Sequence, residues 1–149
     1  MSKHHSCGRY ASRMEIRPYD RRDLEDVLRL WQECELIDDP QSAIAMIERK
    51  MTVDGRLFVG VENEDLVGSI MVGDEGRRGW LNLLAVAPSH RRSGLGAQLV
   101  QFAEDLLAVE GCPKVNLQIR WDNDDVVGFY EKLGYRDDRV ISMGKPLKN

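Results

Sequence analysis

The chain has 149 residues, of which 42% are hydrophobic, so it is the size of one domain and can bury a core of its own. Its 21 basic and 25 acidic residues give a net charge of −4, which argues against a global basic field that would recruit nucleic acid. Three cysteines at unrelated spacings favour a reducing, cytoplasmic location over a disulfide framework, and neither a membrane-spanning apolar run nor a signal peptide is visible.

The N-terminal stretch shows neither helical nor strand periodicity. We expect residues 1–13 to be a disordered extension or a non-native remnant, and residues 14–149 to form a single domain. His4, His5 and Cys7 lie in this stretch without a fourth ligand, so we predict no metal site there.

Hydrophobic periodicity then predicts strands and helices that alternate along the chain. Trp31 and Cys34 fall on the buried face of the first helix, and Asp39 before Pro40 is expected to cap the second. This pattern predicts an α/β or α+β layer structure. The expected elements are a strand over 14–17, helices over about 23–35 and 40–51, strands over 57–61, 66–72 and 80–86, a helix from about 94 to 111, a strand over 115–120, a short helix through 130, and strands near 135–138 and 140–145.

Residues 84–96 read LAVAPSHRRSGLG and combine a strand end, a proline turn, two arginines and two glycines at the start of a helix. Gly94 and Gly96 let the backbone approach a ligand closely, and the unpaired N–H groups of the first helical turn attract phosphate. Arg91 and Arg92 add positive charge. The segment is therefore predicted to bind an anion such as a diphosphate.

Two familiar phosphate loops are excluded by the residues that follow Gly96. A Walker loop requires Lys and then Ser or Thr, where this chain has Ala97 and Gln98. The dinucleotide fingerprint requires a third small residue, where this chain has Leu99. The spacing from Arg91 to Gly96 instead resembles the acyl-CoA pyrophosphate loop of the GNAT superfamily of N-acyltransferases.

A second segment, NDDVVGFYEKLGY, runs from Asn123 to Tyr135 and is similar to the later CoA-binding helix of the same superfamily. The two motifs are independent and stand in the expected order, and the resemblance extends from Met14 to about Lys145. The segments IERKM, LFVGVE, GCPKVNLQI and FYEKLGY most resemble the bacterial YpeA type of small acetyltransferase.

The resemblance implies a GNAT fold, in which a mixed, mostly antiparallel sheet of six or seven strands packs with four helices. The fourth and fifth strands would splay apart, and pantetheine would dock beside them like an extra strand. Acetyl-CoA would be the cosubstrate, with no metal. The residues implied in binding it are Leu84, Ala85, Val86, Arg91, Arg92, Ser93, Gly94, Leu95, Gly96, Ala97, Asn123 and Tyr130.

Tyr130 is also expected to be catalytic, because a phenol can protonate the thiolate that leaves as CoA. The alternative is that Tyr130, like Phe129, packs against the sheet as an ordinary amphipathic ring. The general base stays unassigned. Protein N-terminal acetyltransferases of the superfamily commonly carry Glu where this chain has Gln118, and Asn82 is equally non-basic. Deprotonation through ordered water and arrival of a neutral amine both stay open.

An acidic stretch surrounds the expected loop between the first two helices, in a region that commonly covers the acceptor site of the superfamily. It could steer a cationic amine, or it could be a solvated helix end with a cap. His90 is expected to be an exposed turn residue rather than a proton shuttle. The stretch consists of Glu33, Glu35, Asp38 and Asp39.

The preferred function is that of an N-acetyltransferase, which moves an acetyl group from acetyl-CoA to a primary amine by direct transfer in a ternary complex. The acceptor stays open between a small molecule, an amino acid and a protein lysine. One alternative is a non-catalytic acyl-CoA-binding or sensing module, which Gln118 makes conceivable. Another is a structural module whose exposed strand edges pair in a homodimer. Neither nucleic acid nor a membrane is expected as a partner.

Overall fold

The structure is a computed structural model that describes residues 14–148. The predictions made for the N-terminal stretch, including its His4, His5 and Cys7 cluster, lie outside the described residues. The chain divides into two compact units, the first ending at Asn116 and the second beginning at Leu117. A single domain over residues 14–149 therefore stays a prediction.

A five-stranded sheet in the order β1-β2-β3-β4-β5 forms the centre of the first unit and ends at its boundary. From β1 to β4, each strand pairs antiparallel with the next. The N–H of Gly79, at the start of β4, donates to the carbonyl of Lys114, just before β5, at 2.8 Å. The strands are β1 (Glu15–Pro18), β2 (Leu57–Glu62), β3 (Asp65–Asp74), β4 (Gly79–Val86) and β5 (Val115–Leu117).

Four α-helices and two short 3₁₀ turns complete the secondary structure of residues 14–148, and the number of α-helices is the one predicted. Asp39 caps α3 as expected, because its carboxylate accepts hydrogen bonds from the N–H groups of Gln41 and Ser42. Within this part of the chain, no helix is long and apolar enough to span a membrane. The elements are η1 (Arg21–Asp23), α2 (Leu24–Glu33), α3 (Pro40–Val53), η2 (Pro88–His90), α4 (Leu95–Val109) and α5 (Asp124–Lys132).

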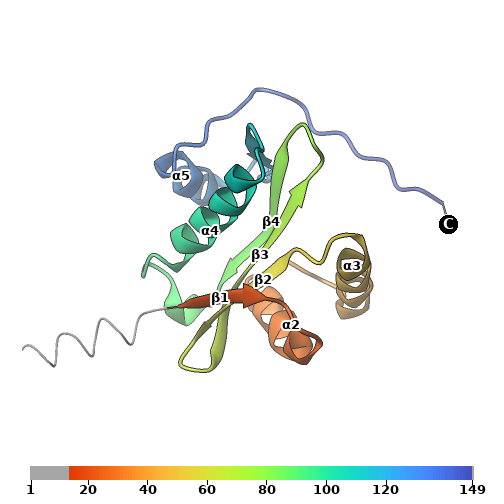
Figure 1. Ribbon diagram of the computed structural model, residues 1–149, viewed down its shortest axis with the longest axis vertical. Coiled ribbons are helices and arrows are strands. Elements are labelled where there is room, and N and C mark those ends of the chain that lie inside the picture. Colours follow the sequence, from red (N-terminus) through yellow and green to blue (C-terminus); the bar gives the residue numbers. More distant parts are fainter. Residues whose placement is uncertain (1–13, 149) are drawn as a thin grey trace, which may run out of the picture. The chain divides into compact units, whose positions relative to one another are not determined.

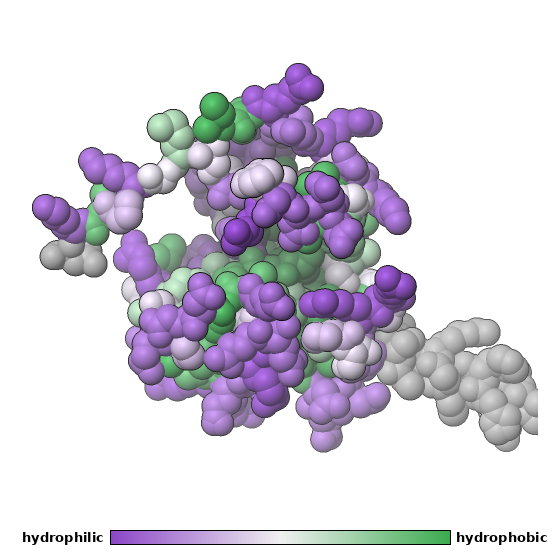
Figure 2. Space-filling view, turned by 180° about the vertical axis from the view of Figure 1, so that it is seen from behind, coloured by the Kyte–Doolittle hydropathy of each residue, from purple (hydrophilic) through white to green (hydrophobic). Residues whose placement is uncertain are grey.

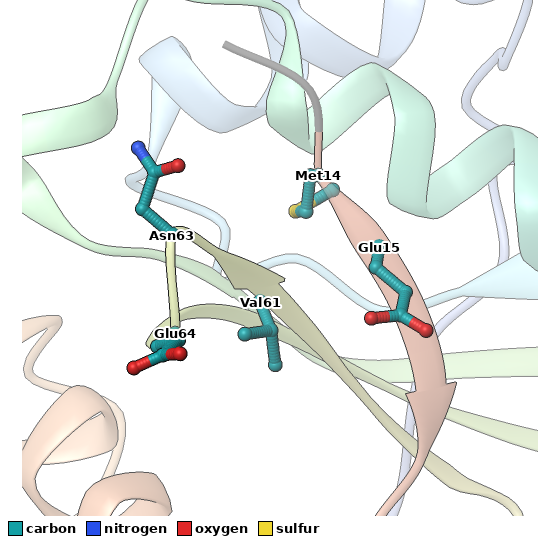
Figure 3. A pocket seen from close by; sticks show the side chains of 5 residues that line it. All are labelled: Met14, Glu15, Val61, Asn63 and Glu64. Carbon is teal, nitrogen blue, oxygen red and sulfur yellow. The ribbon is translucent and has the colours of Figure 1, made fainter. Parts of the chain in front are cut away.

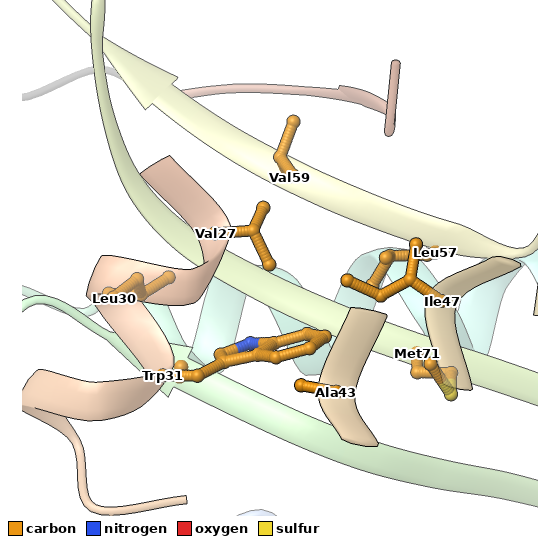
Figure 4. Close-up of a cluster of buried hydrophobic side chains, with 9 residues drawn as sticks. Val27, Leu30, Trp31, Ala43, Ile47, Leu57, Val59 and Met71 are labelled. Carbon is orange, nitrogen blue, oxygen red and sulfur yellow. The ribbon is translucent and has the colours of Figure 1, made fainter. Parts of the chain in front are cut away.

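Helices α2 and α3 cover one face of the sheet, and α4 covers the other (Figure 1). On the first face, apolar side chains from both helices meet those of β2, β3 and β4 (Figure 4). Trp31 is fully buried there and is a core residue, as its helical spacing predicted. The nine residues of this cluster are Val27, Leu30, Trp31, Ala43, Ile47, Leu57, Val59, Met71 and Ala85.

The second face is closely packed because β3 has a glycine beneath α4. A Cβ on Gly68 would lie only 2.9 Å from Cδ1 of Leu99, so a larger residue would push the helix away. The rings of Phe58 and Phe102 meet edge to face with centroids 4.8 Å apart. These contacts fix α4 on the sheet, and hence the position of its N-terminus beside the end of β4.

Two expectations about strands were wrong. The sheet has five strands rather than six or seven, because β5 ends at Leu117 and residues 136–148 form no strand. Val140, Ile141 and Met143 are 78%, 88% and 90% exposed, although their segment reads as a strand. A run of β-favouring residues becomes a strand only when its backbone finds a partner, and periodicity does not show whether one exists.

Elsewhere the exposed residues are mostly hydrophilic, as on the face seen in Figure 2.

Candidate functional site

The predicted site begins at the end of β4, where the strand carries a β-bulge. Ser69 of β3 pairs with Ala85, whereas Met71 pairs with Asn82, so Leu83 and Leu84 together occupy the place opposite a single residue. Leu83 has a φ of 52°, in the left-handed region. Sequence patterning did not predict this bulge, because alternation shows which face a side chain occupies but not where the pairing slips by one residue.

The predicted cofactor-binding residues of β4 differ in exposure. Ala85 is buried, and the residues on either side of it, Leu84 and Val86, are half-buried. The carbonyl of Val86 accepts hydrogen bonds from Sγ of Cys34 and from Nε of Arg91, both at 3.3 Å. Cys34 is thus half-buried against the strand, in agreement with the prediction that it packs in the core.

The loop after β4 leads into α4 through two left-handed residues, Arg92 with a φ of 65° and Gly94 with a φ of 84°. The Ser93 hydroxyl donates to the carbonyl of His90 and closes the turn. Gly94 is the N-cap residue and has no side chain with which to cap the helix. Its carbonyl accepts from the N–H of Gln98 at 3.1 Å, so the regular helical hydrogen bonds begin there.

The N–H groups of Leu95, Gly96 and Ala97 form the first turn of α4, which receives no side-chain cap. They carry the positive end of a helix of 15 residues. Leu95 is buried and anchors the turn, whereas Gly94 is exposed. This arrangement suits an anion that approaches from solvent, and its binding there stays a prediction.

Arginine and histidine side chains surround this turn. Arg91 and Arg92 are both exposed, and Arg91 also lies 3.5 Å from Sγ of Cys34. His90 was expected to be exposed but is half-buried, because its Nε2 lies 3.2 Å from Oε1 of the buried Glu62. Its Nδ1 lies 2.9 Å from the hydroxyl of Ser89. Pairing with Glu62 was not expected, because it joins residues 28 positions apart in the sequence.

The second unit holds the other two predicted site residues. Asn123 is the N-cap of α5, where its Oδ1 accepts a hydrogen bond from the N–H of Val126 at 3.3 Å. Asp124 and Asp125 lie in the first turn, where the positive helix end favours them.

Tyr130 lies near the end of α5 and is 7% exposed. Its ring packs edge to face between those of Phe129 and Tyr135, with centroids 5.0 and 5.4 Å away. Burial raises the pKa of Tyr130 to about 12, since the charged phenolate is poorly solvated there. The phenol is therefore protonated at neutral pH, and its ring contacts agree with the packing role that was the alternative.

The structure thus gathers residues 84–97 in one place, and Asn123 and Tyr130 belong to a separate compact unit. A pocket of about 520 Å³ lies elsewhere in the first unit, beside the turn between β2 and β3 (Figure 3). Two carboxylates line it, Glu15 and Glu64, so it does not suit a diphosphate. Among residues 14–148, no group of three or more His, Cys, Asp or Glu side chains could hold a metal ion.

Comparisons with known proteins agree on one family. The sequence profile of the Acetyltransferase (GNAT) family matches residues 24–135. An acetyltransferase of Yersinia pestis (strain Pestoides F) is 42% identical over 138 residues, which are 90% of this chain and 96% of the relative.

Two solved structures have a similar fold. The aminoglycoside N-acetyltransferase AAC(6')-Iy in complex with CoA superposes with a TM-score of 0.77 and 20% identity, over 91% of this chain and 96% of that one. PaiA N-acetyltransferase from Thermoplasma acidophilum, in complex with coenzyme A, gives a TM-score of 0.75 and 18% identity, over 87% and 93%. At these identities the likeness shows the fold alone.

Proposed function

Because the chain belongs to the acetyltransferase (GNAT) family and transfers an acetyl group from acetyl-CoA to an amine, we propose that residues 84–97 bind the acetyl-CoA and that Tyr130 protonates the departing thiolate. The observation that carries this proposal is the uncapped N-terminus of α4, with its three first-turn N–H groups beside two exposed arginines. The diphosphate of CoA is the anion we assign to it.

Roles follow from the kinds of group that each segment offers. The N–H groups of Leu95, Gly96 and Ala97 bind the diphosphate, and the guanidinium groups of Arg91 and Arg92 neutralise its charge. Pantetheine pairs with the end of β4 in the manner of a strand, using main-chain groups of residues 84–86. Asn123 contacts the cosubstrate through atoms that its capping bond leaves available.

The reaction is a direct transfer in a ternary complex. The amine nitrogen attacks the carbonyl carbon of the thioester, a C–N bond forms and the C–S bond breaks. The nitrogen gives up a proton to water, the thiolate receives one from the hydroxyl of Tyr130, and water returns a proton to the phenolate. A backbone N–H that points at the carbonyl oxygen stabilises the negative charge that develops on it. Neither a metal nor a covalent acetyl-enzyme is required.

The acceptor is a primary amine that the acidic stretch between α2 and α3 attracts. Glu33, Glu35 and Asp38 are exposed, while the carboxylate of Asp39 is engaged in capping α3. The side-chain hydrogen bond from Ser42 lowers the pKa of Asp39 and so stabilises its charged form. Four negative charges in so short a stretch favour a cationic acceptor. We assign the protein to the cytoplasm and expect the monomer or a homodimer to need neither nucleic acid nor a membrane.

The experiment is to measure release of CoA from acetyl-CoA with a panel of small amines, amino acids and lysine peptides, alongside calorimetry of CoA binding. Release that depends on the amine, with mass-spectrometric detection of the acetylated amine, supports the proposal and identifies the acceptor class. Tight CoA binding without release across the panel favours an acyl-CoA-sensing module instead. Absence of CoA binding refutes the assignment of residues 84–97.

A further inference from the structure

We propose that Ser69 and Trp31 are positioning residues, which hold the bulge of β4 so that the N–H of Leu84 points at the thioester carbonyl of acetyl-CoA. This inference rests on the function proposed above and deepens it. Neither residue belongs to the segment from Leu84 to Ala97, and neither is needed to bind the diphosphate.

A chain of two buried hydrogen bonds reaches the bulge from α2. The indole N–H of Trp31 donates to the hydroxyl oxygen of Ser69 at 2.9 Å, and that hydroxyl donates to the carbonyl of Leu83 at 2.8 Å. Both side chains are fully buried. With the indole as its donor, the Ser69 oxygen is left with its own proton for Leu83, so the direction of the second bond is determined.

The carbonyl that Ser69 holds belongs to the irregular residue of β4. Leu83 has a φ of 52°, a conformation that costs a residue with a Cβ and that needs support from its surroundings. The Ser69 hydroxyl gives such support, because it provides a hydrogen-bond partner for the carbonyl of this residue.

The geometry of the peptide unit transmits this constraint to Leu84. In a trans peptide the C=O and the following N–H point in opposite directions, and the described chain has no cis peptide. Since the carbonyl of Leu83 points at the hydroxyl of Ser69, the N–H of Leu84 points away from that hydroxyl. We assign this N–H to the thioester carbonyl of acetyl-CoA, where a fixed donor stabilises charge on the oxygen.

A purely structural role would also explain why Ser69 is buried. The test must therefore measure a property of the thioester carbonyl of bound acetyl-CoA. Difference infrared spectra of acetyl-CoA labelled with ¹³C at the carbonyl give the stretching frequency of the bound thioester, and no acceptor amine is needed. Hydrogen bonding to the oxygen lowers this frequency. The variants are Ser69→Ala, which removes both hydrogen bonds, and Trp31→Phe, which removes the indole donor and keeps an aromatic ring.

Val59→Ala is the matched control. Val59 is fully buried in the same core cluster, and neither hydrogen bond involves it. Its truncation destabilises the same face of the sheet without altering the bulge. For all variants, we measure thermal unfolding and the Kd of CoA, which lacks the thioester carbonyl.

We expect the wild-type protein to lower the carbonyl frequency, and Ser69→Ala to lose at least half of that shift and about ten- to a hundredfold in kcat. Trp31→Phe loses a smaller part, and Val59→Ala keeps the full shift. The Kd of CoA stays within about twofold throughout. If Ser69→Ala does not fold, Trp31→Phe provides the test. A full wild-type frequency shift in Trp31→Phe overturns the role of the indole and of the two hydrogen bonds that run from it to Leu83.

A folded Ser69→Ala protein with the wild-type shift and kcat overturns the inference while leaving the proposed function intact. Failure of the wild-type protein to bind acetyl-CoA overturns the proposed function, and the positioning role with it. Binding of acetyl-CoA without any shift in the wild-type protein overturns the assignment of the Leu84 N–H alone.

Discussion

Replacement of Gly94 by alanine tests how the N-terminus of α4 binds its anion. Gly94 has a φ of 84°, and a Cβ at this position would meet no atom within 4 Å. The cost is therefore one of backbone conformation and not of steric contact. This cost is about 1–2 kcal/mol for an L-residue in the left-handed region. Alanine also lowers the conformational entropy of the unfolded chain, which offsets about 0.4–1 kcal/mol of the cost.

Strain at Gly94 is relieved by rotating the backbone that leads into the first turn. Because Leu95, Gly96 and Ala97 follow directly, their N–H groups turn away from the diphosphate. A hydrogen bond to a charged group contributes about 1.5–3 kcal/mol, and loss of one raises the Kd of CoA by roughly ten- to a hundredfold. Isothermal calorimetry with CoA measures this, and thermal unfolding reports stability.

Gly76→Ala is the control, because Gly76 has a φ of 95° and equally open space around its Cβ position, and lies in the turn between β3 and β4. Both variants should lose about 1 kcal/mol of stability by the same reasoning. Only Gly94→Ala should lose affinity for CoA. Equal CoA affinities of the wild type and Gly94→Ala would show that the helix start does not hold the diphosphate.

The other predictions concern the phenol, an ion pair and the loop charge. Tyr130→Phe should lower kcat by about a hundredfold with the Kd of CoA unchanged; steady-state kinetics that match the wild type would remove the acid role. Burial raises the pKa of Tyr130 to about 12, so the folded state favours the neutral phenol. The stability that this gives is present below pH 10 and is lost between about pH 10 and 12. Denaturant unfolding should show that Tyr130→Phe does not lose this stability over the same pH range. Arg17 donates two hydrogen bonds to Asp23, at 2.9 and 3.0 Å, and these are the main cause of the lowered pKa of Asp23. The stability that they contribute to the fold is present above the ordinary pKa of an aspartate and is lost as pH falls through the lowered pKa of Asp23. Asp23→Asn should cost roughly 1.5–3 kcal/mol at pH 7 and flatten the acid side of the stability profile, and an unchanged profile would exclude the pair as its cause. Arg92→Gln should weaken CoA binding severalfold at low salt and reduce the salt dependence of the Kd. Calorimetry at two salt concentrations measures this. The same change of Kd with salt in the wild type and in Arg92→Gln would argue against a charge contact.

Local sequence signals predicted the elements that local chemistry determines. Asp39 before a proline indicated the start of α3, and the glycines at 94 and 111 marked both ends of α4. Each of these positions acts through its own backbone or its nearest neighbours, so no knowledge of the tertiary structure was needed. The uncapped first turn of α4 was predictable for the same reason.

Features that depend on distant partners were missed. The bulge at Leu83 requires the register between β3 and β4, and the hydrogen bond from Trp31 joins residues 38 positions apart. The single available signal was a serine within the apolar run LVGSIMV, since a buried hydroxyl needs a partner. The strands expected near 135–138 and 140–145 did not form in the described chain, because strand residues need a neighbouring backbone as well as a suitable pattern.

The most direct test of the account is a titration of the ¹⁵N-labelled protein with CoA, followed by amide chemical shifts. We expect the largest changes at Leu95, Gly96 and Ala97, whose N–H groups we assign to the diphosphate. Saturable CoA binding with its changes elsewhere, such as around Glu15 and Glu64, and none in the first turn of α4, would contradict it.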